Sequence, residues 1–239
     1  MVAALTGLVR ATHPGPAALV VAISVLVAMW SGRDLAGVML VSATVLSGQV
    51  GVGWLNDLLD RERDIRVGRR DKPLVTGTVS AHLLRAAIAI SVPVCVLLSL
   101  LNGVTAGVVH LVAVASAWSY DLGLKATVLS PAPYALSFGL LPVFVALGLP
   151  GHPPAAGWVV ATGALLGVSA HFLNCLPDLA GDRRTGVLGL PQRLGRRGSL
   201  TAAGVCVGAS LAVVAIAVLS GTAARGVSVE TALASLWPR

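Results

Sequence analysis

Seven stretches of mostly apolar residues alternate with shorter polar segments along the chain. A helix needs about 20 apolar residues to cross a bilayer, and all seven stretches approach or reach that length. They cover residues 15–31, 35–55, 82–101, 104–119, 128–149, 155–175 and 199–220. The pattern predicts an all-α, polytopic membrane bundle, with residues 1–239 forming a single transmembrane domain.

The composition agrees with this pattern and excludes a soluble globule. Hydrophobic residues make up 56% of the chain and charged residues only 11%, with a mean hydropathy of +0.86. Soluble domains are about half apolar and a quarter charged. The first ten residues place their only arginine after the apolar stretch and lack a cleavage pattern, so we expect no removed signal peptide.

The positive charges predict an orientation. If the N-terminus lies inside, segments 56–81, 120–127 and 176–198 face the cytoplasm, and 14 of the 17 Lys and Arg lie on that side. Arg33, Arg225 and Arg239 then lie outside, as does the C-terminus after seven spans. Cytoplasmic loops are enriched in Lys and Arg. Topology therefore explains the net charge of +7, and we expect no nucleic-acid partner.

Eight of the ten acids lie on the same side and belong largely to a sequence repeat. Segments 56–77 and 174–195 share the frame N-x3-D-x3-D-x-R-x-G-x4-P-x3-G without a gap, at a constant offset of 118 residues. Four predicted spans separate the copies, so both leave the membrane at the same face. The repeat predicts two parallel halves, at about 15–119 and 128–220, whose motifs face each other across one central cavity.

The repeated residue types suit a metal-bound diphosphate. On a continuing helix, the Asn and two Asp of each copy form one stripe, because they recur every four residues. Carboxylates beside a membrane cavity are functional candidates, and Mg²⁺ is commonly held by carboxylates together with substrate phosphates. Basic residues for the phosphate oxygens are Lys72, Lys125, Arg66 and its repeat mate Arg184. The alternative is a solvated acidic face that pairs with nearby arginines.

These motifs resemble those of the UbiA superfamily of intramembrane prenyltransferases. The segment NDLLDRERD is similar to the family's N-D-x2-D-x3-D, and DKPLVTG to its R-P-L-x-x-G, with Lys72 where Arg is usual. PDLAGDRRTG followed by LPQRLG is similar to the second motif and its continuation. YDLGLK is similar to the tyrosine and lysine segment between the motifs, which points to Tyr120 and Lys125.

The resemblance implies an isoprenyl diphosphate donor and more than one Mg²⁺ ion at the paired motifs. The metal ligands by motif position are Asn56, Asp57, Asp60, Asp64, Asp178 and Asp182, and Asn174 follows from the repeat as a diphosphate ligand beside Asn56. The residues expected to act in catalysis are Asp60, Asp64, Asp178, Asp182, Lys125 and Tyr120. His171 precedes Asp178 by seven residues and is either a proton acceptor or a packed helix residue.

The resulting hypothesis is Mg²⁺-dependent transfer of an isoprenyl group to an aromatic or other lipophilic acceptor, in a multi-pass protein of a bacterial cell membrane. Acceptor identity and prenyl length stay open. A membrane terpene cyclase or an ion-coupled transporter is the alternative function, whereas the D-G-x2-A-R element of CDP-alcohol phosphotransferases is absent after either motif. The family usually has nine helices, so we expect a second copy or a partner subunit to cover the missing pair.

Overall fold

The computed structural model describes residues 2–223, which fold entirely into helices and the turns between them. The helices are α1 (Val2–Ala11), α2 (Pro14–Trp30), α3 (Leu35–Val67), α4 (Ala81–Leu101), α5 (Val104–Asp121), the 3₁₀ turn η1 (Leu124–Ala126), α6 (Ala132–Leu147), α7 (Gly157–Cys175), α8 (Leu179–Arg184) and α9 (Leu190–Leu219). The predicted all-α fold is confirmed. Arg225 and Arg239, expected on the outer side, lie beyond the described residues.

All seven predicted apolar segments are helices, but they differ in their capacity to cross a bilayer. By length and composition, the helices α3, α4, α7 and α9 can each cross a membrane. Helices α1 and α2 are bent by 60° relative to each other, and they add a fifth span if the pair counts as one. The 16 residues of α6 extend about 24 Å, which is less than the roughly 30 Å of a hydrocarbon core. The count of seven crossings stays a prediction.

Helix α3 is the element that carries the first acid motif out of the apolar layer. It has 33 residues and is therefore about 50 Å long, so it continues a dozen residues past the predicted end of its span at residue 55. Asp34 begins the helix by accepting a hydrogen bond from the Gly37 amide. Gly68, with a φ of 73°, ends it.

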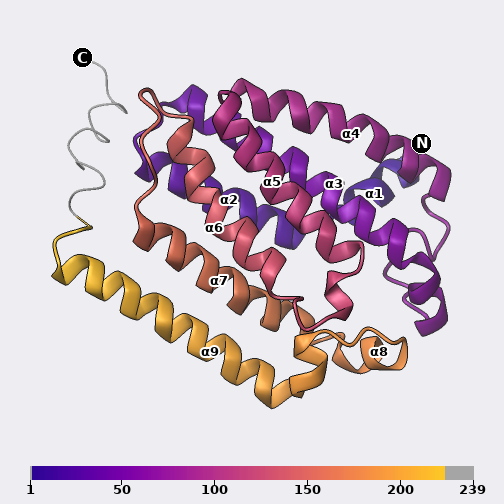
Figure 1. The fold of residues 1–239 in the computed structure, drawn as a ribbon. Coiled ribbons are helices and arrows are strands. Elements are labelled where there is room, and N and C mark those ends of the chain that lie inside the picture. The colour runs from indigo at the N-terminus through magenta and orange to yellow at the C-terminus, as the bar shows by residue number, and fades with distance from the viewer. Residues whose placement is uncertain (1, 224–239) are drawn as a thin grey trace.

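The helices form one bundle in which each of α1 to α6 packs against the next α-helix in the chain, and α9 packs against α7 and α8 (Figure 1). Helix α3 also contacts α5, and α2 also contacts α6, so these four helices surround a common interior. At one end of that interior, Val41, Val45, Phe144 and Val145 belong to the buried apolar core. The last turns of α3 lie with α1 and α8 at the other end of the bundle (Figure 1).

Glycines at matching positions of the two repeat copies share an unusual backbone conformation. Gly68 and its mate Gly186 have φ values of 73° and 83°, and Gly77 and Gly195 have 73° and 72°. Left-handed φ values are readily adopted only by glycine. All four positions therefore favour glycine, although Gly77 lies in a turn and Gly195 at a kink within α9.

Close packing of α6 and α7 gives a prediction for stability. A Cβ at Gly167 would lie 2.5 Å from the Tyr134 carbonyl oxygen, whereas a Cβ at Gly204 on α9 would meet no atom within 4 Å. We expect Gly167→Ala to lower the free energy of unfolding by about 1–3 kcal/mol through overpacking. Gly204→Ala is the matched control and should not lower it. Thermal unfolding in detergent measures both, and equal melting temperatures would show that the α6–α7 contact is not tight.

Candidate functional site

The two acid motifs have different backbone structures. In the first, Asp57, Asp60 and Asp64 lie on continuous helix and are only 1%, 6% and 2% exposed. In the second, α7 ends at Cys175 and α8 begins at Leu179, so Asn174, Asp178 and Asp182 do not share one helix. Pro177 accounts for the break, because proline has no N–H to donate to the helix and its ring clashes with the carbonyl four residues earlier. The single stripe therefore forms only in the first copy.

Arg63 brings carboxylates of both motifs together. Its guanidinium lies 2.7 Å from the carboxylate of Asp60, 3.9 Å from that of Asp64 and 3.6 Å from that of Asp182. Gln192 at the start of α9 donates a 2.8 Å hydrogen bond to Asp182. Burial raises the pKa of Asp182, although the bond from Gln192 and the charge of Arg63 oppose this. Three carboxylates from α3 and α8 thus converge on one positive charge.

Arg69 makes a second link between the motifs. One guanidinium nitrogen lies 2.9 Å from the carboxylate of Asp178, and another lies 2.9 Å from that of Asp71. The hydrogen bonds from Arg69 hold the pKa of Asp71 at about 2. Asp178 is half-exposed, so this link lies at the rim of the site.

The segment between α5 and α6 contributes Lys125 to the first motif. Its Nζ lies 2.5 Å from Oδ1 of Asp60 and 3.9 Å from Oδ1 of Asp121. Asn56 donates from Nδ2 to Asp60 at 3.1 Å and to Asp121 at 2.8 Å. The predicted residues Asn56, Asp60 and Lys125 are therefore brought together, with Asp121 beside them.

Asp57 and Lys72 form a separate, buried ion pair. Lys72 Nζ donates to Asp57 Oδ1 at 2.6 Å, and His13 Nε2 lies 2.8 Å from the same oxygen. Lys72 is 8% exposed. His13 itself has a left-handed φ of 54° at the junction of α1 and α2. This cluster joins the N-terminal helices to α3, beneath the loop that carries Lys72.

Aromatic side chains lie beside the second motif. The ring of Tyr120 stands edge-on to Tyr134 at 5.4 Å and to His171 at 5.6 Å between centroids. The Tyr134 hydroxyl accepts a 3.3 Å bond from Asn174. His171 is fully buried and bonds Ser130 at 3.1 Å, as expected of a packed histidine. Tyr120 thus belongs to an aromatic cluster next to the acids.

Two predicted diphosphate ligands lie outside the cluster of carboxylates. Arg66 is exposed and donates to the backbone carbonyl of Glu62. Arg184 is exposed on α8. Their roles stay predictions, whereas Arg63 and Arg69 are the arginines that the fold directs toward the motifs. Arg63 has a signal in the sequence, because it follows Asp60 by three residues on a helix.

A small apolar cavity lies next to the paired Asn56 and Asp121. It has a volume of about 60 Å³ and is lined by residues of α2, α3, α5 and α6, including Val52, Ala117 and Phe138. Val52 and Ala117 precede Asn56 and Asp121 by four residues, so they lie one turn below them on the same helix faces. The cavity therefore lies in the apolar interior, one helical turn from these two polar residues.

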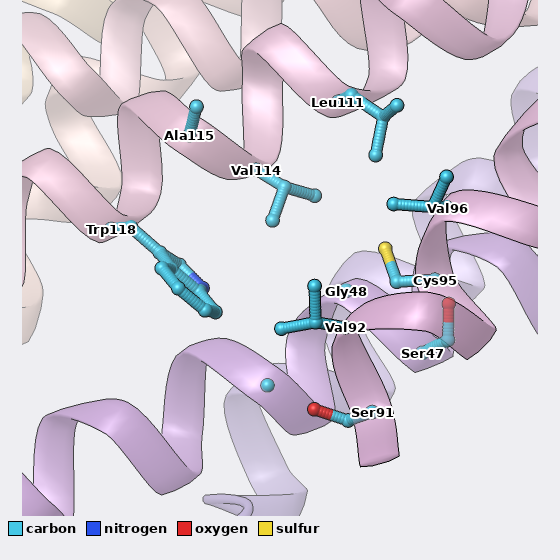
Figure 2. A pocket seen from close by; sticks show the side chains of 11 residues that line it. Ser47, Gly48, Ser91, Val92, Cys95, Val96, Leu111, Val114, Ala115 and Trp118 are labelled. Carbon is cyan, nitrogen blue, oxygen red and sulfur yellow. The ribbon is translucent and has the colours of Figure 1, made fainter. Parts of the chain in front are cut away.

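A larger cavity of about 150 Å³ lies between α3, α4 and α5 (Figure 2). Its lining is almost entirely apolar and includes Val92, Val96 and Trp118 together with the small residues Gly48 and Gly51. None of the motif acids lines it. No motif acid lines the smaller cavity either, so we place the chemistry at the cluster of charged groups around Asp60 and Arg63.

The oxygen-rich motifs fit Mg²⁺ in donor chemistry. Within residues 2–223, no three His, Cys, Asp or Glu side chains are spaced as a ready-made metal site. Mg²⁺ is usually held by one or two carboxylates plus substrate phosphates and waters. Asp60, Asp64 and Asp182 already surround a cation, the guanidinium of Arg63. The arrangement suits a metal that binds together with a diphosphate.

Comparison with known proteins identifies relatives of this fold. The model of the UbiA prenyltransferase family matches residues 5–238. A search among curated proteins finds no match. Three solved structures are similar to the chain. One is of a digeranylgeranylglyceryl phosphate synthase (17% identity, TM-score 0.68, covering 91% of this chain and 78% of that one). Another is of an Aeropyrum pernix K1 UbiA homologue without ligand (21%, 0.68, 97% and 84%). The third is of an Archaeoglobus fulgidus UbiA homologue bound to Cd²⁺ (16%, 0.71, 96% and 82%).

Proposed function

The chain belongs to the UbiA prenyltransferase family, and from that premise we propose that it transfers an isoprenyl group from an allylic isoprenyl diphosphate to a lipophilic acceptor. The observation that carries the proposal is the convergence of Asp60, Asp64 and Asp182 on Arg63, which joins both acid motifs at one place. A diphosphate requires a cluster of this kind, with carboxylates for a metal and cations for the remaining oxygens.

Mg²⁺ would be held by Asp60, Asp64 and Asp182, with Asp178 and Asn56 beside them. When bound, the metal neutralises charge on the departing diphosphate. The Cd²⁺ in the Archaeoglobus fulgidus homologue supports a divalent cation in this fold. Lys125, which lies 2.5 Å from Asp60, supplies a fixed positive charge for the diphosphate oxygens.

The apolar part of the donor would lie in the cavity below Asn56 and Asp121. When the allylic C–O bond breaks, its electron pair leaves with the diphosphate and a delocalised cation remains on the tail. Phe138 lines this cavity and Tyr134 stacks on it, with Tyr120 edge-on to Tyr134, and aromatic faces attract cations. The acceptor then supplies the electron pair of the new bond and loses a proton.

The same proposal places the acid motifs at the cytoplasmic face, because most Lys and Arg lie at that end of the bundle. The proposal also includes a location in a bacterial cell membrane. It further includes a second copy or a partner subunit that packs against the bundle. The chain spans 78–84% of the three solved relatives.

The experiment that tests the function is diphosphate release by the purified protein in detergent. Donors with two, three, four or more isoprene units are compared, with and without Mg²⁺ and with aromatic and lipid acceptors. We expect release that needs Mg²⁺ and favours one tail length. No release from any donor with any acceptor would contradict the proposal, and release of a cyclic hydrocarbon without acceptor would identify a cyclase instead.

A further inference from the structure

Asp121 is a buried carboxylate that lies outside both acid motifs. It is the last residue of α5 and is 6% exposed. Its Oδ1 accepts the 2.8 Å bond from Asn56, and its Oδ2 is buried with no hydrogen-bond partner among the described residues. Such a group needs an explanation, because buried polar atoms are usually paired.

The contacts of Asn56 define how its amide group is oriented. Nδ2 donates to Asp60 at 3.1 Å and to Asp121 at 2.8 Å. Both partners are carboxylates, which accept but do not donate when ionised. The nitrogen must therefore face them, and both of its hydrogens are used. The amide oxygen of Asn56 consequently points away from the two carboxylates, and an amide oxygen is a ligand that hard cations accept.

We infer that Asp121 is a positioning residue that holds the amide oxygen of Asn56 toward the metal-bound diphosphate, an inference that rests on the proposed function. Asp60 alone fixes one amide hydrogen and leaves rotation possible, whereas two carboxylates on one nitrogen fix the plane of the amide. Outer partners that orient a metal ligand in this way typically contribute 10- to 100-fold to metal affinity.

A role limited to holding Lys125 does not account for these contacts. Lys125 lies 3.9 Å from Asp121 but 2.5 Å from Asp60, so Asp60 is its hydrogen-bonded partner. The close contact of Asp121 is with Asn56. A merely structural role would lower the melting temperature without changing metal affinity, and this difference can be measured.

The test measures binding of Mn²⁺ in the presence of inorganic diphosphate, with free Mn²⁺ followed by electron paramagnetic resonance and no turnover required. We expect Asp121→Ala to weaken Mn²⁺ binding about tenfold or more. Asp121→Asn should bind more tightly than Asp121→Ala, because its amide oxygen still accepts from Asn56. Ser119→Ala, whose hydroxyl bonds only its own helix at the Ser116 carbonyl, is the matched control and should bind as the unaltered chain does.

A double-variant cycle shows whether Asp121 acts through Asn56. If it does, Asp121→Ala should cause little further loss in a chain that already carries Asn56→Ala. Fully additive losses, or unchanged binding by folded Asp121→Ala, would overturn this inference. The proposed function would still stand in that case if the unaltered chain releases diphosphate in a metal-dependent way. No Mn²⁺ and diphosphate binding by the unaltered chain would overturn both.

Discussion

Replacing Asp60 with Asn should reduce diphosphate release by about a hundred- to a thousandfold, the effect expected when one group that stabilises developing charge is lost. Asp60 contacts Arg63, Lys125 and Asn56, so more parts of the site meet there than at any other acid of the two motifs. Asn keeps the volume and one acceptor oxygen but removes the negative charge that a metal requires. Release of diphosphate from the best donor at saturating Mg²⁺ measures the effect.

The matched control for Asp60→Asn is Glu62→Gln on the same helix. Glu62 is exposed, and its change also removes one negative charge at the same face of the membrane. We expect release to stay near that of the unaltered chain. If both variants lose activity equally, surface charge rather than the coordination chemistry of Asp60 controls the reaction, and the proposed metal site is wrong.

The helices were largely predictable from the sequence, because spans depend on composition over about 20 residues. All seven segments are helical, and the structure differs mainly at their ends. Helix α3 extends from a predicted end at residue 55 to Val67, and α9 begins at Leu190 rather than at residue 199. Both extensions are charged segments that hydropathy assigns to loops; the one on α3 continues the helix, whereas the one on α9 is a short helical segment that a kink at Gly195 separates from the span.

The residues of the candidate site could be predicted where their position in a motif identifies them. They were harder to predict where only tertiary packing brings a side chain into the site. The motifs single out both Asp60 and Lys125, and the two side chains meet although 65 residues separate them. Arg63 was not predicted although its place three residues after Asp60 on a helix was a signal, and Asp121 was not predicted because a charge near a motif has the same sequence signal whether it faces the site or the solvent. Pro177 was the available signal that the second motif is not one helix.

Replacing Lys72 is the second change for which we expect a large effect, and the effect is a loss of folding stability. Asp57 is 1% exposed, and its Oδ1 accepts a 2.6 Å hydrogen bond from Lys72. Removing one partner of a buried ion pair leaves an uncompensated charge, which destabilises by about 3–5 kcal/mol. We therefore expect Lys72→Met to lower the free energy of unfolding by roughly 3 kcal/mol, because His13 still contacts Asp57. Unfolding in detergent measures the loss.

A second variant separates this role from the diphosphate contact that the motif resemblance implies for Lys72. Adding Asp57→Asn to Lys72→Met removes the unpaired charge and should restore most of the stability, since a neutral pair has no buried ion to compensate. Arg70→Met, which changes an exposed residue of the same loop, should shift stability by no more than about 0.5 kcal/mol. If Lys72→Met instead keeps its stability and loses diphosphate release, Lys72 binds the donor directly, and the pair with Asp57 must open when the donor binds.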